Sequence, residues 1–282
     1  MKLSSIYSDK NSRLKISFEV FPPKDKNNYK KLYEELSVLK HFKPEFVSLT
    51  WGAGGNDNNS TELIKNIIAL GLNVMPHFTC VCSSKDFVKE HIKYLEEYNI
   101  QNILALRGDI PENRINSCGD FKYANELVRF IKSISDLSIG VAGYPEGHIE
   151  ANSLDEDIKN LKRKVDSGAD AIFTQLFFDN DLYFKYVDKV HKADINVPVI
   201  PGIMPILSIK QIEKMTNLAR ITIPEYLADK LDKYKNSNDD IQKFGIEFGI
   251  NQCKNLLSEG VTGLHFFTLN KSNSTKEILE NL

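Results

Sequence analysis

The chain has 282 residues, of which 41% are hydrophobic, and its formal net charge is −2, from 36 basic and 38 acidic residues. Because the charges are interspersed, the composition indicates neither a nucleic-acid partner nor an anionic membrane. No segment approaches the roughly 18 to 20 uninterrupted apolar residues of a membrane helix, and residues 1–10 lack the apolar run of a signal peptide. The four cysteines, Cys80, Cys82, Cys118 and Cys253, form no CxxC pair. We therefore expect a reduced, cytoplasmic protein.

The first predicted strand covers residues 16–21. Its β-branched and aromatic residues favour a strand, and Pro22 and Pro23 cannot extend a ladder. Alternation places Ser17 and Glu19 on the same face. On an exposed edge strand, Glu19 would simply be solvated. On a strand buried on both faces, burial would raise the pKa of Glu19 and let it act as an acid near neutral pH.

Strands and helices alternate along the rest of the chain. Further strands are predicted over residues 46–50, 72–79, 102–106, 138–143, 171–175, 197–201 and 263–268. Helices are predicted over residues 27–41, 61–70, 87–98, 123–134, 155–167, 182–191, 209–218 and 244–257, with a short terminal helix. An additional helical stretch covers residues 224–234. The polar residues 235–240 that follow it are predicted as a solvated turn.

Eight strand–helix units at this spacing predict an α/β fold, a parallel sheet closed into a (β/α)8 TIM barrel. We expect one domain over residues 1–282, with an extra helix before the eighth strand. A doubly wound open sheet is the alternative. It would normally carry a GxGxxG before its first helix, and the sequence has none.

Polar side chains recur where the predicted strands end, which is where barrels carry their chemistry. They are Glu19, Thr50, His77, Arg107, Asp109, Tyr144, Gln175 and His265. So many polar strand ends favour the pocket interpretation of Glu19. On the helix over residues 155–167, Asp157, Asn160 and Lys164 form one polar stripe, which is either a solvated face or part of this site.

Several motifs together resemble the methylenetetrahydrofolate reductases, in the family's order and across nearly the whole chain. They are Ser17–Pro23, Val47–Ala53, Pro76–Cys80, Ala105–Asp109, Tyr144–His148, Asn160–Lys164, Gln175–Asp179, Ile200–Pro205 and His265–Asn270. The resemblance implies a flavoprotein barrel that reduces 5,10-methylenetetrahydrofolate to 5-methyltetrahydrofolate by a ping-pong hydride relay, supplying methyl groups for methionine synthesis. The co-substrate would be NADH or NADPH. We expect the short bacterial form, which usually prefers NADH, and a homo-oligomer.

The resemblance also assigns roles to single residues. Glu19 would be the general acid that protonates the bridging nitrogen of the folate, and Asp109 would contact the pterin ring near the flavin. Gln175, Gln211 and Lys271 would contact the folate. FAD binding carries over to Thr50, Trp51, Ala53, His77, Arg107, Gly108, Asp109, Ala124, Tyr144, His148, Ala151, Asp157, Asn160, Arg163 and Lys164.

Two positions depart from the family pattern. Many members carry arginine where this chain has Lys271, and lysine lacks the planar fork that grips a carboxylate at two points. Met215 stands where a bacterial relative has a phenylalanine, so the packing surface there is softer. Both changes concern folate affinity.

Three other functions remain open from the residues alone. A proline-dehydrogenase-like flavin barrel would be bleached by proline rather than by NADH. A non-catalytic folate or flavin carrier would bind FAD without oxidising NADH. A Schiff-base aldolase needs a lysine at a strand end, and the predicted strand ends offer none before Lys271.

Overall fold

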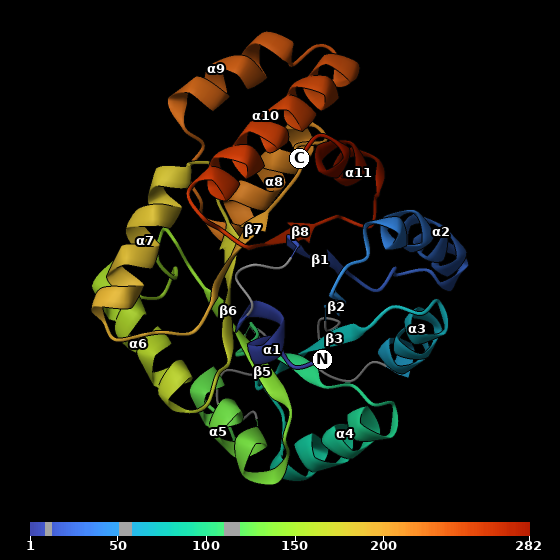
Figure 1. The fold of residues 1–282 in the computed structure, drawn as a ribbon, viewed down its shortest axis with the longest axis vertical. Helices are drawn as coiled ribbons and strands as arrows, with labels where there is room; N and C mark the ends of the chain where they lie inside the picture. Colours follow the sequence, from blue (N-terminus) through green and yellow to red (C-terminus); the bar gives the residue numbers. More distant parts are fainter. Residues whose placement is uncertain (9–12, 51–57, 110–118) are drawn as a thin grey trace.

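The computed structural model describes residues 1–8, 13–50, 58–109 and 119–282. Its strands form a closed parallel barrel in sequence order, with β1 paired to both β2 and β8 (Figure 1). The strands are β1 (Lys15–Val20), β2 (Phe46–Leu49), β3 (Val74–Thr79), β4 (Asn102–Leu106), β5 (Ser138–Gly143), β6 (Ala171–Leu176), β7 (Val199–Ile203) and β8 (Gly263–Phe267). The predicted (β/α)8 barrel is confirmed.

Helices surround the strands (Figure 1). They are α1 (Leu3–Ser8), α2 (Tyr29–Leu39), α3 (Asn58–Ala69), α4 (Lys85–Glu97), α5 (Ala124–Ile134), α6 (Leu154–Asp166), α7 (Asn180–Lys192), α8 (Ile209–Ala219), α9 (Glu225–Tyr234), α10 (Asn238–Ser258) and α11 (Asn273–Glu280), with the 3-10 turns η1 (Lys26–Asn28) and η2 (Lys40–Phe42). The extra helix before the last strand is confirmed as α9. In the described residues, no helix is both long and apolar enough to span a bilayer.

Two sequence predictions were wrong. The polar residues 235–240 are not all turn, because α10 begins at Asn238. The Ser237 side chain accepts a hydrogen bond from the Asp240 backbone N–H and so caps the helix. The cysteines are not all reduced either: Cys80 and Cys253 are free and buried, whereas Cys82 is disulfide-bonded.

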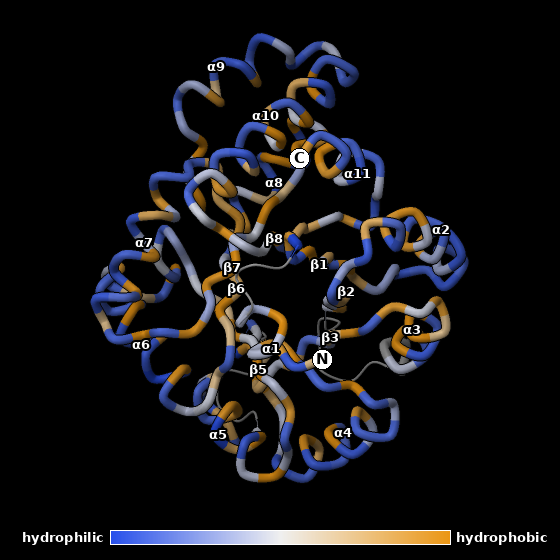
Figure 2. The backbone as a smooth tube through the Cα atoms, in the orientation of Figure 1, coloured by the Kyte–Doolittle hydropathy of each residue, from blue (hydrophilic) through white to orange (hydrophobic). Residues whose placement is uncertain are grey.

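The helices pack on the barrel through apolar faces. Figure 2 shows hydrophobic and hydrophilic segments alternating along their turns, which is the pattern of amphipathic helices. Outward-facing strand residues such as Val47 and Val141 join the helix residues in one large core. Inward-facing residues, among them Phe46, Met75 and Phe173, form a separate cluster inside the barrel.

Helix α1 closes one end of the barrel interior, and the sequence analysis did not predict it. Figure 1 shows this short helix in the middle of the ring of strands. Leu3, Ile6 and Tyr7 are buried in the interior cluster. Asn102, the first residue of β4, accepts a hydrogen bond from the Leu3 N–H (2.9 Å) and donates one to the Met1 carbonyl (2.9 Å). Helix α1 therefore fills the amino-terminal end of the barrel.

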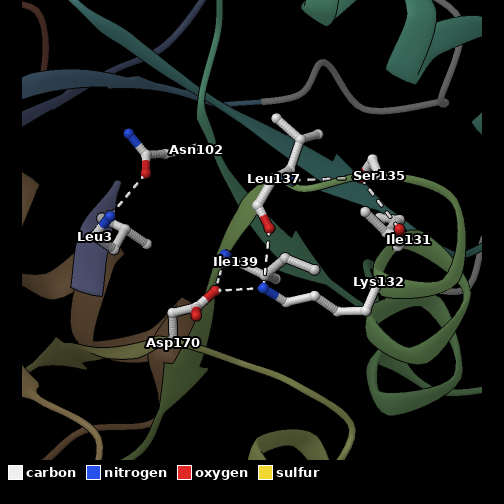
Figure 3. A network of polar contacts seen from close by, with 8 residues as sticks. All are labelled: Leu3, Asn102, Ile131, Lys132, Ser135, Leu137, Ile139 and Asp170. Carbon is white, nitrogen blue, oxygen red and sulfur yellow. Dashed lines mark hydrogen bonds and ion pairs between the residues drawn. The ribbon is translucent and has the colours of Figure 1, made fainter. Parts of the chain in front are cut away.

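The same end carries a polar network that joins α5 to β5 and β6 (Figure 3). The Lys132 ammonium contacts the Asp170 carboxylate at 2.8 Å and donates to the Leu137 carbonyl at 3.0 Å. Asp170 also accepts a hydrogen bond from the Ile139 N–H (2.7 Å). These contacts stabilise the amino-terminal face, which leaves the carboxyl ends of the strands for chemistry.

Two glycines of α10 provide a test of its packing. A Cβ at Gly245 would collide with the backbone carbonyl of Ile206, whereas a Cβ at Gly249 would meet only the side-chain tip of Ile278, at 2.5 Å. Alanine normally stabilises a helix relative to glycine, by about 1 kcal/mol. We expect Gly245→Ala to lower the free energy of unfolding by roughly 2 kcal/mol, because backbone cannot move aside as a side chain can.

Urea unfolding of both variants checks this prediction. Gly249→Ala is the matched control and should cost clearly less, because the Ile278 side chain can change rotamer. A Gly245→Ala protein as stable as the wild type would show that α10 does not pack this closely on the segment after β7.

Candidate active site

Glu19 lies between two histidines near the carboxyl end of the barrel. Alternation along β1 turns Ser17 and Glu19 to the interior. The Glu19 Oε2 atom lies 3.4 Å from His77 Nε2 and 3.5 Å from His265 Nε2. The Glu19 side chain is 19% exposed, against 7% for His77 and 1% for His265. Three strands, β1, β3 and β8, thus bring one carboxylate and two imidazoles together.

Two buried serines also contact these imidazoles. The Ser48 hydroxyl lies 2.7 Å from His77 Nε2, and the Ser17 hydroxyl lies 2.8 Å from His265 Nδ1. The strand register explains the second contact, since Ser17 is level with His265, and it also places Ser48 level with Glu19. Both imidazoles therefore have fixed orientations. His265 appeared in the sequence only as a polar strand end, and no sequence signal linked it to Glu19.

The pKa of Glu19 differs from the sequence prediction. Burial alone would raise it, but the charges and hydrogen bonds of His77 and His265 outweigh burial and lower the pKa from 4.5 to about 2. The prediction of a raised pKa was therefore wrong, because the sequence indicated burial but not the two imidazoles. At neutral pH Glu19 is a carboxylate, which must receive a proton before it can donate one.

A second cluster lies between β5 and α6. The Lys164 ammonium donates to the Ala142 carbonyl at 2.6 Å and lies 5.8 Å from the centre of the Tyr144 ring. Burial lowers the pKa of Lys164 from 10.5 to about 8, an effect that Asp157 partly opposes. Burial also raises the pKa of Asp157, whose side chain is almost fully enclosed. Asp157 and Lys164 are thus not part of a solvated helix face.

An ion pair links the loops that follow β4 and β5. Both terminal nitrogens of Arg107 contact the Glu150 carboxylate, one of them at 2.7 Å. This contact raises the pKa of Arg107 and lowers that of Glu150. His148 packs edge-on against Tyr144 at 4.8 Å and accepts a hydrogen bond from the Glu150 N–H. The sequence gave no sign of Glu150, which shares no motif with Arg107.

The other predicted flavin residues lie on several elements: after β2, after β4, at the start of α5, and before or within α6. Thr50 follows β2, and its N–H bonds to the Val20 carbonyl. Gly108 has φ +82, Asp109 is exposed, Ala124 begins α5 and Ala151 lies before α6. Arg163 is exposed and donates to Asn160 Oδ1 at 2.9 Å. Trp51 and Ala53 lie outside the described residues.

The predicted folate residues form a third group. Gln175 lies in β6 beside a register shift, and its Oε1 accepts from the Leu176 N–H at 2.9 Å. Gln211 lies in the first turn of α8 and accepts from the Leu207 N–H at 3.0 Å. Lys271 is exposed beyond β8, and Met215 is a partly buried residue of α8. Within the described ranges, none of their hydrogen bonds reaches Glu19.

A cavity of about 500 Å³ lies elsewhere, between α7, α9 and α10. Phe178, Tyr226 and Phe248 form its apolar wall, and Asp179 and Lys230 contribute charges. None of the predicted site residues lines it. The chemistry of the strand ends, rather than the size of this cavity, identifies the candidate site.

The charges of the second cluster and of Arg107 fit a dinucleotide such as FAD. A half-buried ammonium and a guanidinium, from Lys164 and Arg107, suit phosphates, and the buried carboxylate of Asp157 suits ribose hydroxyls. Among the described residues, Lys164 has one recorded hydrogen-bond acceptor for its three N–H groups. In the described part of the chain, Lys164 therefore keeps N–H groups that an anion could accept from, whereas both terminal nitrogens of Arg107 already contact Glu150.

Comparison with known proteins identifies the family. The profile described as Methylenetetrahydrofolate reductase matches residues 3–282. The chain belongs to the methylenetetrahydrofolate reductase family. A relative from Buchnera aphidicola subsp. Schizaphis graminum, named 5,10-methylenetetrahydrofolate reductase, is 38% identical over 265 residues, which cover 93% of this chain and 89% of that protein. An Arabidopsis thaliana relative, Methylenetetrahydrofolate reductase (NADH) 1, is 38% identical over 284 residues.

The two relatives differ in length. The match covers 94% of this chain but 48% of the Arabidopsis protein, so this reductase-family chain spans about half of that relative. Among solved structures, a Clostridium thermocellum protein described as uncharacterized and as binding two copies of 5-methyl-5,6,7,8-tetrahydrofolic acid has a TM-score of 0.64 at 12% identity, covering 96% of this chain and 94% of that one. At that identity the likeness supports the fold alone.

The pKa of Glu19 predicts a pH-dependent stability. Because folding lowers this pKa from 4.5 to about 2, the carboxylate stabilises the fold above pH 4.5. That contribution is lost as the pH falls from 4.5 through 2. The difference in unfolding free energy between the wild type and Glu19→Gln should therefore be largest near pH 5 and shrink toward pH 3. Urea unfolding at pH 5, 4 and 3 measures it; a constant difference would contradict the histidine contacts.

Proposed function

We propose that this chain reduces 5,10-methylenetetrahydrofolate to 5-methyltetrahydrofolate, with FAD as cofactor and NADH as the favoured co-substrate. The observation that carries the proposal is Glu19, held as a carboxylate between His77 and His265 in a barrel of this family. The name of the Arabidopsis relative supports NADH. Methyl supply for methionine synthesis and a homo-oligomer are proposed from the family resemblance, and a cytoplasmic location from the amino-terminal sequence and the cysteine pattern.

The flavin would be held mainly by the second cluster. A bound FAD would supply the hydride chemistry, accepting hydride from the nicotinamide in one half-reaction and giving it to the folate in the other. Lys164 and Arg107 would neutralise the phosphates, and Asp157 would bind ribose hydroxyls. For Arg107 to do so, its contact with Glu150 has to loosen or be shared. Backbone approach near Gly108 and contacts from Thr50, His148 and Tyr144 would complete the cradle.

The proton for the folate would pass through Glu19. Opening the five-membered ring of the folate requires a proton on its bridging nitrogen, which creates an iminium that accepts hydride. Glu19 is ionised at neutral pH, so the proton has to come from a neighbour. The ring nitrogens of His77 and His265, 3.4 and 3.5 Å from its Oε2, are the groups placed to supply it. A histidine that gives up its proton also loses the charge that lowers the Glu19 pKa, so the transfer itself favours the protonated carboxyl.

The folate itself would contact four further residues. Asp109 would face the pterin ring, and Gln175 and Gln211 would bind through their side-chain amides. Each of these amides already accepts one backbone hydrogen bond, so its orientation is set. Lys271, exposed beyond β8, would attract the folate carboxylates as a point charge.

The first functional test separates the half-reactions. Flavin reduction by NADH needs no proton on the folate nitrogen, so it should survive Glu19→Gln. Flavin reoxidation by methylenetetrahydrofolate should fall by roughly 10²- to 10⁴-fold, the usual contribution of a general acid. Anaerobic stopped-flow absorbance measures both rates. Glu34→Gln, an exposed change on α2, is the matched control.

The outcomes distinguish the competing roles of Glu19. Equal slowing of both half-reactions would make it a flavin-positioning residue. Unchanged rates would place the acid elsewhere, with Asp109 as the next candidate. A wild-type protein that is reduced by NADH but never reoxidised by the folate would disprove the proposed reaction.

The second functional test concerns Lys164. Lys164→Met should weaken FAD binding by roughly 1 to 3 kcal/mol, the loss expected for a charged hydrogen bond. The matched control is Lys162→Met on the same helix, because Lys162 pairs with Asp166 instead. Fluorescence titration of flavin-free protein with FAD gives both affinities. Equal affinities in the two variants would remove Lys164 from the flavin site.

The low pKa of Lys164 adds a pH dependence to this test. Its ammonium loses its proton near pH 8 in the flavin-free protein, and a bound phosphate favours the charged form. FAD affinity of the wild type should therefore fall as the pH rises from 7 to 9.5. Lys164→Met should lack this fall, since it has no proton to lose there.

A further inference from the structure

The segment after β8 folds back over the end of β1. The ladder between these strands ends where Glu19 lies level with Phe267. The next residue, Thr268, continues the contact, because both its N–H (3.2 Å) and its hydroxyl (2.7 Å) donate to the Glu19 carbonyl. The backbone of the residue proposed as the acid is therefore bound by two donors from one buried threonine.

Asn270 binds the backbone of β1 further along, at Phe21. Its Nδ2 donates to the Phe21 carbonyl at 2.8 Å, and its Oδ1 accepts from the Phe21 N–H at 3.0 Å. The side-chain amide thus pairs with Phe21 as the peptide of a neighbouring strand would. Asparagine suits this role because one short side chain offers both a donor and an acceptor.

The backbone conformation needed for this contact is unfavourable. Leu269 and Asn270 both have positive φ, 52° and 57°. The left-handed region costs an ordinary L-residue roughly 1 to 2 kcal/mol, although asparagine tolerates it better than most. Two such residues in a row persist only where surrounding contacts fix them. The Thr268 hydroxyl contributes, accepting from the Asn270 N–H at 3.2 Å.

The end of β1 needs this support because its own sequence cannot provide it. Pro22 and Pro23 have no N–H, so the strand cannot pair beyond Phe21. On the β2 side, one hydrogen bond from the Thr50 N–H reaches the Val20 carbonyl. On the β8 side, Thr268 and Asn270 supply the remaining bonds. Glu19 lies two residues before the doubly held Phe21.

We propose that Asn270 is a positioning residue for the acid. It fixes the end of β1, and through it the place of the Glu19 carboxylate between His77 and His265. This inference rests on the proposed reductase function. A displacement of about 1 Å can cost roughly 10²-fold in rate, so loss of the Asn270 contacts affects the proton-dependent half-reaction far more than flavin reduction.

The test uses Asn270→Gly in the FAD-loaded protein. Glycine keeps the positive φ without strain and removes both hydrogen bonds to Phe21. Reoxidation by methylenetetrahydrofolate should slow by roughly 10- to 100-fold, while reduction by NADH should change by less than about threefold. Hydrogen exchange at the Phe21 amide should speed up at the same time. Asn99→Gly is the matched control, because exposed Asn99 also has positive φ (53°), at the end of α4.

A second variant covers the case in which Asn270→Gly does not fold. Asn270→Asp keeps the acceptor for the Phe21 N–H but turns a carboxylate oxygen toward the Phe21 carbonyl, which it repels, so reoxidation should slow in this variant too. Equal slowing of both half-reactions, or an unchanged Phe21 exchange rate, would overturn the positioning role. If the wild type itself is not reoxidised by the folate, the proposed function fails, and Phe21 exchange still tests the contact with Asn270.

Discussion

The closure of the barrel is the constraint on which the candidate site depends. Only because β8 pairs with β1 does His265 come within 3.5 Å of Glu19, although 246 positions separate them in the chain. The pairing of β1 with β2 brings Ser48 to the same level, where it holds His77. An open sheet would leave β1 or β8 at an edge, and the carboxylate would then face water instead of a second imidazole.

Much of the fold could be predicted from the sequence because strands and helices differ in period. Short apolar strands alternated with amphipathic helices, and the polar strand ends located the face that carries Glu19 and His77. Contacts between distant elements could not be predicted. All of these depend on which residues the closed barrel brings together: the ion pair of Arg107 with Glu150, the packing of α1 into the amino-terminal end, and the lowered pKa of Glu19.

The two charged clusters are tuned in opposite ways. Around Glu19, nearby imidazoles overcome the cost of burial and favour the charged form of the carboxyl group. Around Lys164, burial dominates and disfavours the charged form of the amine, since Asp157 compensates only in part. The first arrangement keeps Glu19 as a carboxylate until a neighbouring group protonates it. The second suits a cation that gains its full charge when an anion arrives.

Helix α1 has a consequence for how the candidate site is approached. Because Leu3, Ile6 and Tyr7 fill the amino-terminal end of the barrel, that end is closed in the described part of the chain. Glu19 and its two imidazoles lie toward the opposite end, where the strands lead into the loops that carry Arg107 and Glu150. The end that holds the barrel together and the end that can bind a ligand are thus separate, so substitutions in the loops of one need not weaken the other.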